Sequence, residues 1–537
     1  MKTEGFFFVH KQRRSEQTKT GEKHKEGENV FRKFAALALL LCLTATACAC
    51  AKKKNPAPDT VGEAYTLKYY EIGNQDTVSR MAVQKAINAY LQPKIGANLE
   101  FVLVSWGDWD AKALTALQAG ERIDLFFTAD WKGYARSVGQ GLFTPLNASE
   151  GEYGNLLENY GQEILNSLNP AFLTGTQVGG VNYAVPTNKE LCVPQGYIYN
   201  AEAAQEVGMD PAAIKGIADL EPYLQKYKEL HPEQYPYLTD KRWSESPWCE
   251  SFVSGLNFNL LSMPLAPNES SIWNETVQSI WESGADKTYA ETIFRYAQAG
   301  YIDPDTALAQ YDPLTAFNAG SFLTYTAPLK GEGIKAQEMK NASGNPDLNL
   351  GEIYTQPTII TTQHTGGAMI AIPTTSQRAD LAMQLINLMH SDSDLLDLML
   401  YGVKDSMWRF ADDGRVELLD ASWYGAHGGA WTMGNTAIQH VTVDEDPEKN
   451  RRLQEYSEGA AEHPSLGFRY VCPPEMEARM AALNNVADSM NNALISGAVD
   501  PEAALPQYIL SLKAAGLDDL RADVQRQYEE WKDKKEA

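Results

Sequence analysis

The first part of the chain alternates short apolar runs with longer stretches in which apolar residues recur at helical spacing. The segments Thr66–Ile72, Leu99–Val104 and Ile123–Thr128 have the length and apolar character of buried strands. Between them, Ser79–Leu91 and Asp110–Ala119 show helical periodicity. Strand–helix alternation with short connections predicts an α/β domain with right-handed crossovers. In such a domain, ligands bind beyond the carboxyl ends of the strands.

The rest of the chain continues this mixed pattern and then becomes helical. Further strands are predicted at Val181–Val185, Gly196–Tyr199, Phe322–Thr326 and Ala368–Ile372, and helices at Asp219–Leu230, Ser271–Gln298 and Arg378–His390. The turn at Asp412-Asp413-Gly414 predicts a hairpin between Met407–Phe410 and Arg415–Leu419. The tail from Glu475 to Lys535 is predicted to form three helices, with Pro501 and Gly516 at their boundaries.

The strongest apolar run lies near the N-terminus, at Phe34–Leu43. It is shorter than the roughly 20 residues of a membrane-spanning helix and follows two basic residues, as the core of a signal peptide does. The sequence Ala45-Thr46-Ala47-Cys48 that follows resembles a bacterial lipoprotein signal. This resemblance implies a signal peptide over residues 1–47 and a lipid anchor, of the palmitate-bearing kind, on Cys48, with Cys50 as the alternative. The charged, proline-containing residues 48–65 are typical of a flexible tether.

Residues 1–29 do not fit the short basic segment that opens a signal peptide, because they carry five acidic residues beside seven basic ones. The stretch Lys25-Glu26-Gly27-Glu28 has the composition expected of a translated purine-rich ribosome-binding sequence. We therefore hypothesise that the true start is Val30.

The charge balance excludes some functions. Seventy acidic residues face 46 basic ones, for a formal charge of −24. A nucleic-acid binder needs a basic face to replace phosphate counterions, and docking on anionic lipid needs basic clusters. We therefore expect no nucleic-acid partner, and contact with the membrane only through the lipid anchor.

The chain has no motif for a metal, a cofactor or a nucleophile. HExxH, paired CxxC, P-loop and GxSxG patterns are absent, and the eight histidines are isolated from one another. We expect no metal and no cofactor, and no residue is assigned a catalytic role. Carboxylates are abundant enough that a glycosidase pair could be present without any pattern to identify it.

The order of four segments resembles a known family. After the lipoprotein-like signal come IDLFFTADWKGYARSVGQGLFTPL, YAVPTNKE with GYIYN, FLTYTAP, and HTGGAMIAIPTTSQRADLAMQLINLM. Together they resemble an extracellular solute-binding lipoprotein of a carbohydrate-type ABC importer, in the long Gram-positive subgroup that has an extra C-terminal domain of unknown function. The resemblance covers the chain from about residue 66 to its end.

The resemblance implies a two-lobed α/β fold of the class II periplasmic-binding type with a mostly helical C-terminal extension. The expected N-terminal lobe is residues 66–187 and 356–400, and the C-terminal lobe is residues 188–355. Residues 401–537 are expected to pack on the C-terminal lobe. The chain should cross between lobes near Ala184–Glu190 and Tyr354–Thr365, and Pro186, Thr187 and Asn188 are suited to a hinge.

Sugar recognition needs flat aromatic faces and a few planar polar groups, and the chain has eleven tryptophans. Two pairs of candidates, Trp106 with Asp108 and Asp130 with Trp131, follow predicted strands, and Glu190 follows the first crossing. The resemblance adds Trp248, Tyr325 and His364, in segments that line the family's cleft. It also adds Trp408, Trp423 and Trp431, in the subgroup's C-terminal region, of which Trp431 is assigned to the site. Trp273, Trp281 and Trp531 are expected to be packing residues.

The favoured function is capture of an extracellular solute, an oligosaccharide in the first instance, by a monomeric lipoprotein on the outer face of the cell membrane. The protein would deliver the solute to the transmembrane subunits of an ABC permease. Two alternatives stay open: a surface enzyme acting on glycans, and a binding or sensing lipoprotein without a permease. Turnover of a glycan panel separates the enzyme from the receptor, and neighbouring permease genes separate the receptor from the sensor.

Overall fold

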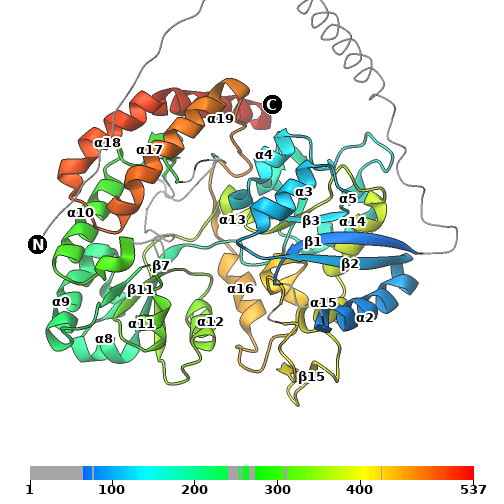
Figure 1. The fold of residues 1–537 in the computed structure, drawn as a ribbon, viewed down its shortest axis with the longest axis horizontal. Helices are drawn as coiled ribbons and strands as arrows, with labels where there is room; N and C mark the ends of the chain where they lie inside the picture. The colour runs from blue at the N-terminus through cyan, green and yellow to red at the C-terminus, as the bar shows by residue number, and fades with distance from the viewer. Residues whose placement is uncertain are drawn as a thin grey trace, which may run out of the picture. The chain divides into compact units, whose positions relative to one another are not determined.

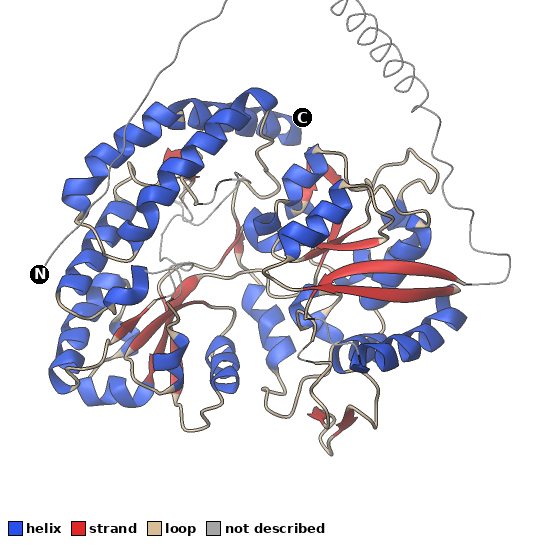
Figure 2. Cartoon of the chain, viewed as in Figure 1, coloured by secondary structure: helices blue, strands red, loops and turns tan. Residues whose placement is uncertain are grey.

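The computed structural model describes residues 64–74, 78–239, 253, 256, 258–264, 273–307, 311–424 and 426–536. Within these residues the chain forms two lobes, each built around its own β-sheet, and a helical C-terminal unit (Figures 1 and 2). The two sheets confirm the predicted two-lobed α/β architecture. Cys48, Trp248 and residues 1–63 lie outside the described residues.

The first lobe has a five-stranded sheet of order β2-β1-β3-β14-β6. Its strands are β1 (Tyr65–Ile72), β2 (Ala97–Val104), β3 (Leu125–Thr128), β14 (Met369–Ala371) and β6 (Ala184–Pro186). The strand β1 pairs in parallel with β2 and β3, whereas β14 runs antiparallel to β3 and β6. The carboxyl ends of β1, β2 and β3 therefore meet at one edge of the sheet, as the predicted strand–helix alternation requires.

Helices cover both faces of this sheet because its strands are apolar on both sides. Alternation along β1 sends Leu67 and Tyr69 into one buried cluster and Tyr70 and Ile72 into another. The helices of this lobe are α2 (Val78–Ile95), α3 (Thr115–Gln118), α4 (Tyr134–Gly139), α5 (Leu156–Tyr160), α6 (Gln162–Ser167), α7 (Pro170–Gly175), α13 (Thr362–Thr365), α14 (Ala379–Met389) and α15 (Ser393–Tyr401).

The second lobe has a four-stranded sheet of order β12-β7-β11-β8. Its strands are β7 (Gln195–Asn200), β8 (Tyr237–Leu238), β11 (Thr324–Pro328) and β12 (Leu350–Tyr354). The strand β7 runs antiparallel to β11 and β12, and β8 runs parallel to β11. The helices are α8 (Ala201–Val207), α9 (Glu221–Leu230), α10 (Ala285–Gln298), α11 (Leu314–Asn318) and α12 (Ile334–Ser343).

The C-terminal unit is the predicted set of three helices, α17 (Glu477–Ile495), α18 (Pro501–Ala515) and α19 (Leu517–Glu536). Pro501 opens α18, and Gly516, with a φ of 108°, ends it in a left-handed conformation. The three helices share an apolar cluster with Ala290 of α10 and with Leu260, Leu261 and Trp281. The unit therefore packs on the second lobe, as Figure 1 shows at the upper left.

The region between α15 and the C-terminal unit departs from the prediction. The predicted hairpin forms as β15 (Trp408–Phe410) and β16 (Val416–Leu418), but Trp408, Val416 and Trp423 are buried in the core of the first lobe. The expectation that all of residues 401–537 pack on the C-terminal lobe is therefore wrong for this stretch. It is contiguous with α15, whose apolar face already belongs to the first lobe. Farther on, α16 (Lys449–Ser457) contacts the second lobe through an ion pair between Lys449 and Glu338.

The predicted helix over Ser271–Gln298 is also shorter than expected. It begins only at Ala285, and the preceding residues include the short strand β10 (Gln278–Ser279), which pairs with β9 (Leu261–Ser262). Trp281 is nevertheless buried, as predicted, because it packs edge-on against Tyr508 of α18.

The chain crosses between the two sheets after β6 and again between β12 and β14, near the predicted positions. The residues proposed as a hinge are held in place. The backbone N–H of Thr187 donates to Ala368, and the side chain of Asn188 donates to Asn435 and to the backbone of Ser167. These bonds hold Pro186, Thr187 and Asn188 in the first lobe. Any rotation of one lobe relative to the other at this crossing would therefore occur at residues after Asn188.

Candidate functional site

Three tryptophans lie side by side at the carboxyl edge of the first-lobe sheet. Trp106 follows β2, Trp131 follows β3, and Trp431 lies in the short helical turn Ala430–Thr432. The ring centroids of Trp106 and Trp131 are 5.7 Å apart, and those of Trp106 and Trp431 are 5.9 Å apart, with interplanar angles of 29° and 11°. We call these three residues the tryptophan row. The row joins candidates that the sequence predicted separately.

Two of the three rings of the row are open to solvent. Trp106 and Trp131 are 45% and 47% exposed, although exposed tryptophans are uncommon on a folded surface. The indole N–H of Trp131 donates to the carbonyl of Gly367 at 2.8 Å, which fixes the ring orientation. Phe127, buried beneath, contacts both Trp131 and Trp431. An aromatic surface held in this way can stack on the C–H face of a sugar without first being ordered.

Asp108 lies beside the row and keeps one carboxylate face toward solvent. Its Oδ2 accepts hydrogen bonds from Ser105 and from Lys112, both at 3.0 Å. The nearby ammonium of Lys112 lowers the pKa of Asp108. The residue is therefore an exposed, ionised acceptor beside Trp106, and nothing in its contacts assigns it a buried role.

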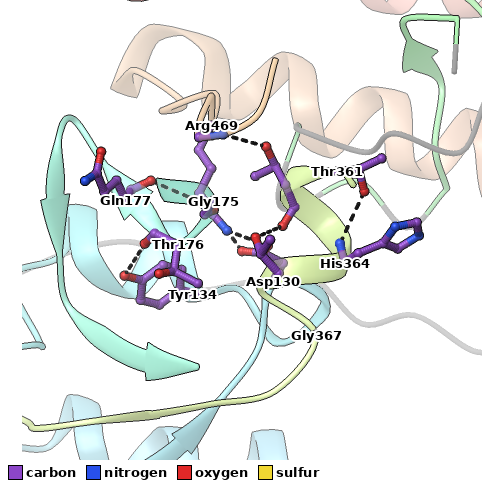
Figure 3. Close-up of polar contacts among 12 residues, drawn as sticks. Asp130, Tyr134, Gly175, Thr176, Gln177, Thr361, His364, Gly367 and Arg469 are labelled. Carbon is purple, nitrogen blue, oxygen red and sulfur yellow. Dashed lines mark hydrogen bonds and ion pairs between the residues drawn. The ribbon is translucent and has the colours of Figure 1, made fainter. Parts of the chain in front are cut away.

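Asp130 has a different environment from its neighbour Trp131. Arg469 binds it in a bidentate manner, with Nε 2.9 Å from Oδ1 and Nη2 2.7 Å from Oδ2 (Figure 3). Arg469 is nearly buried, and its remaining donor reaches the carbonyls of Gly175 and Gln177. Both carboxylate oxygens of Asp130 are thus engaged within the protein. We call this pair the Asp130–Arg469 pair.

Two further candidates meet at the first crossing. Glu190 is almost buried, and its carboxylate lies 3.0 Å from the ammonium of Lys189. Although burial opposes ionisation, the charges of Lys189 and Lys330 lower the pKa of Glu190 to about 2. His364, in α13, has its Nδ1 3.3 Å from the carbonyl of Ile359, and burial lowers its pKa to about 4. At neutral pH the site therefore contains an ion-paired Glu190 and an uncharged His364.

A cavity of about 790 Å³ opens beside Trp131. This volume is in the range of pockets that hold small-molecule ligands. It is bounded by α3 and α4 of the first lobe, by Val253, Leu256, Phe258 and Asn259, and by Asn484 of α17 in the C-terminal unit. Its lining residues are Asp110, Leu114, Gln118, Asp130, Trp131, Lys132, Gly133, Ala135, Arg136, Ser137, Gln140, Val253, Leu256, Phe258, Asn259, Thr362, Gln363, Arg469 and Asn484.

Comparison with known proteins decides the family. The model of the bacterial extracellular solute-binding protein family matches residues 85–402, more than half of the chain. The chain belongs to this family. A second model, for a domain of unknown function (DUF3502), matches residues 464–533, which are the C-terminal unit and the segment that leads into it.

Individual relatives agree with this assignment. A carbohydrate ABC transporter substrate-binding protein of Streptococcus pneumoniae serotype 4 is 25% identical over 480 residues, which cover 88% of this chain and 91% of the relative. The crystal structure of an N-glycan transport solute binding protein from Streptococcus pneumoniae has a TM-score of 0.74 at 23% identity, covering 88% of this chain and all of that one. Structures of that protein with Man1GlcNAc and Man5GlcNAc have TM-scores of 0.70 and 0.68, both at 22% identity. These similarities establish the class II fold.

Not every residue predicted to bind ligand lies at the tryptophan row. Tyr325 is only 7% exposed and packs edge-on against Phe317 in the second-lobe core. Alternation along β11 explains this, because Thr324 and Thr326 take the opposite face. Tyr325 is therefore a core residue that also lines a separate hollow of about 240 Å³. The candidates Trp408 and Trp423 are likewise buried, with their indole N–H groups bonded to backbone carbonyls.

Sequence reasoning missed Arg469 and the amide side chains of the cavity, among them Gln140 and Asn484. These residues come from helices and turns with no local signal, and Arg469 lies 339 positions from its partner Asp130. Among the described residues, no group of three His, Cys, Asp or Glu side chains could hold a metal ion. In the same part of the chain, no helix combines the length and the apolar character needed to cross a membrane.

Proposed function

We propose that this protein is the receptor of a carbohydrate ABC importer, and that it captures an oligosaccharide outside the cell and delivers it to the transmembrane permease. The observation that carries the proposal is the tryptophan row. Exposed, oriented aromatic faces at the ligand edge of an α/β sheet suit the C–H surfaces of sugar rings. Trp106, Trp131 and Trp431 are the proposed stacking residues, with Asp108 as an accepting group for a hydroxyl.

The similarity to sugar receptors supports the same ligand class. The relative from Streptococcus pneumoniae is described as a carbohydrate substrate-binding protein, and the structurally similar receptor has been solved with mannose-containing N-glycan fragments. We propose an oligosaccharide rather than a monosaccharide because the row and the adjoining cavity together extend over several side chains.

The remaining candidates have supporting roles in this proposal. His364 lies beside Gly367, whose carbonyl accepts from Trp131, because its own carbonyl accepts from the backbone N–H of Gly367. Lys189, the ion-pair partner of Glu190, reaches the same glycine. Glu190 and His364 would shape the crossing under the bound sugar. Asp130 would fix the turn that presents Trp131, while its own oxygens stay with Arg469.

The test is a thermal-shift screen over an oligosaccharide panel that includes Man1GlcNAc and Man5GlcNAc. A ligand at 100 times its dissociation constant should add about 2.7 kcal/mol of stability. Trp106→Ala and Trp131→Ala should reduce the shift, whereas Leu510→Ala, at an exposed position of α18, should leave it unchanged. A panel in which no oligosaccharide shifts the wild-type protein would overturn the proposal. Chromatography of the incubated panel should recover every glycan intact, whereas hydrolysis products would favour the enzyme alternative.

We further propose that the protein is a monomer held on the outer face of the cell membrane by a lipid on Cys48. The apolar run and the small residues before Cys48 support this attachment. Incorporation of labelled palmitate should be lost in Cys48→Ala and kept in Cys50→Ala. Equal label in both variants would contradict lipidation at either cysteine alone.

A further inference from the structure

The C-terminal unit is joined to the first lobe by the segment Ser465–Val471, which begins with a turn closed by a hydrogen bond from the backbone N–H of Phe468 to the carbonyl of Ser465. Side chains of this segment pack on both the first lobe and the C-terminal unit. Leu466 lies in the first-lobe core and Arg469 binds Asp130, whereas Phe468 packs on Tyr528 and Trp531 of α19. The backbone of Val471 exchanges two hydrogen bonds with the side chain of Gln527, also in α19. The segment therefore fixes the helices of the C-terminal unit against the ligand edge of the first lobe.

This attachment brings α17 to the 790 Å³ cavity, which it lines through Asn484. Asn484, half-buried on α17, lines the cavity together with Gln118 of α3 and Gln140 of α4. Gln118 and Gln140 already lie close enough to bond to each other, at 3.4 Å, so their amides share one face of the cavity. Trp131 belongs both to the tryptophan row and to the cavity lining. Trp131 is therefore the residue at which the row and the cavity meet.

The chemistry of the lining suits this ligand. An amide side chain offers two donors and an acceptor in one plane, which matches the adjacent hydroxyls of a sugar ring. Gln118, Gln140, Gln363 and Asn484 provide four such groups, and Trp131 provides the aromatic surface. Placing polar groups around an aromatic anchor is how small-molecule sites fix the orientation of a ligand.

We propose that the C-terminal unit is part of the binding site: α17 and Asn484 form a subsite that holds the distal units of a long oligosaccharide whose first units stack on the tryptophan row. This inference rests on the proposed carbohydrate function and adds the length of the ligand and the role of the C-terminal unit. Under it, the protein selects long oligosaccharides over short ones with the same first units.

The experiment compares two neighbouring substitutions on α17. Asn484→Trp fills the cavity, whereas Asn485→Trp places the same side chain at the next, exposed position outside the lining. Isothermal titration uses matched short and long sugars: Man1GlcNAc with Man5GlcNAc, maltose with maltohexaose, and cellobiose with cellohexaose. Gln140→Ala and Asn484→Ala are milder companions, and melting temperatures without ligand verify that each variant folds.

In the pair that the wild-type protein binds, the longer sugar should bind more tightly than the shorter. Asn484→Trp should weaken the longer sugar about tenfold or more while leaving the shorter within about twofold, and Asn485→Trp should change neither. Equal wild-type affinity for both lengths, or equal effects of the two tryptophan variants, would overturn the subsite and leave the proposed function intact. A wild-type protein that binds no sugar of any pair would instead overturn the proposed function, and the subsite with it.

Discussion

Asp130 and Trp131 are consecutive residues with opposite environments. The carboxylate of Asp130 is enclosed by Arg469 and points into the protein, whereas nearly half of the Trp131 surface is exposed. The turn after β3 produces this contrast, because Gly133, with a φ of 74°, closes one helical turn that places the two side chains on different sides. The comparison shows that neighbouring residues at the ligand edge of a sheet can have different roles. Asp130 stabilises the turn at this edge, whereas Trp131 is exposed on it.

The largest expected effect comes from removing the partner of Asp130. Arg469→Leu leaves a buried carboxylate without its cation, which typically costs about 3–5 kcal/mol. Burial already raises the pKa of Asp130 and Arg469 opposes this shift, so the loss should be smaller at low pH, where the acid can be protonated. Urea denaturation at two pH values measures this.

A double variant sharpens the same test. Asp130→Asn combined with Arg469→Met removes both charges, and a neutral pair should recover much of the lost free energy of unfolding. A double variant as unstable as Arg469→Leu would mean that Arg469 acts through packing or through the carbonyls of Gly175 and Gln177 rather than through Asp130.

Trp131→Ala should reduce ligand binding more than it reduces the stability of the fold. It should weaken oligosaccharide binding by about 1–3 kcal/mol, as aromatic anchors of binding sites do. Its cost in unfolding free energy should be well below that of Trp423→Ala, because Trp423 is fully buried and such truncations cost about 3–5 kcal/mol. Calorimetric titration and denaturation of both variants measure the two effects. A large stability loss with unchanged affinity would place Trp131 among the packing residues.

A further effect concerns a second buried acid, Glu71, which forms no ion pair among the residues that the structure describes. Its Oε1 lies 2.9 Å from the hydroxyl of Thr432, which also lies 2.8 Å from the carbonyl of Gly429. One hydroxyl proton cannot serve both acceptors, so a protonated Glu71 that donates to Thr432 completes the chain. Burial raises the pKa of Glu71 to about 8. This chain of bonds holds the turn that carries Trp431.

The sign of the pH dependence follows from that shift. Between pH 4.5 and 8 the unfolded chain has released the proton while the folded protein keeps it, so stability falls as the pH rises. The maximal slope for one such group is about 1.4 kcal/mol per pH unit. Glu71→Gln should flatten this part of the stability profile, measured by urea denaturation from pH 5 to 8. An unchanged slope in the variant would show that Glu71 is ionised in the folded protein.

The sequence predicted the parts of this account that depend on local pattern. The alternation of strands and helices predicted the α/β character of the first lobe, and the family resemblance implied the second lobe. The rule that ligands bind at strand ends pointed to Trp106 and Trp131. The sequence could not predict that Arg469 pairs with Asp130, because Arg469 lies in a segment that follows both lobes in the chain. It also did not predict that Tyr325 packs in the second-lobe core, because an apolar strand does not reveal which face of a sheet an aromatic takes. Asn484 lacks any signal in the sequence, since only the docking of α17 places it at the cavity.

The most direct test of the central claim is a crystal structure of the protein with the oligosaccharide that gives the largest thermal shift. The account predicts a sugar ring stacked on Trp131 or Trp106, the chain continuing toward Asn484, and an Asp130–Arg469 pair that stays intact. A ligand bound elsewhere, for example in the hollow beside Tyr325, with the tryptophan row uncovered, would contradict the assignment of the row as the binding surface.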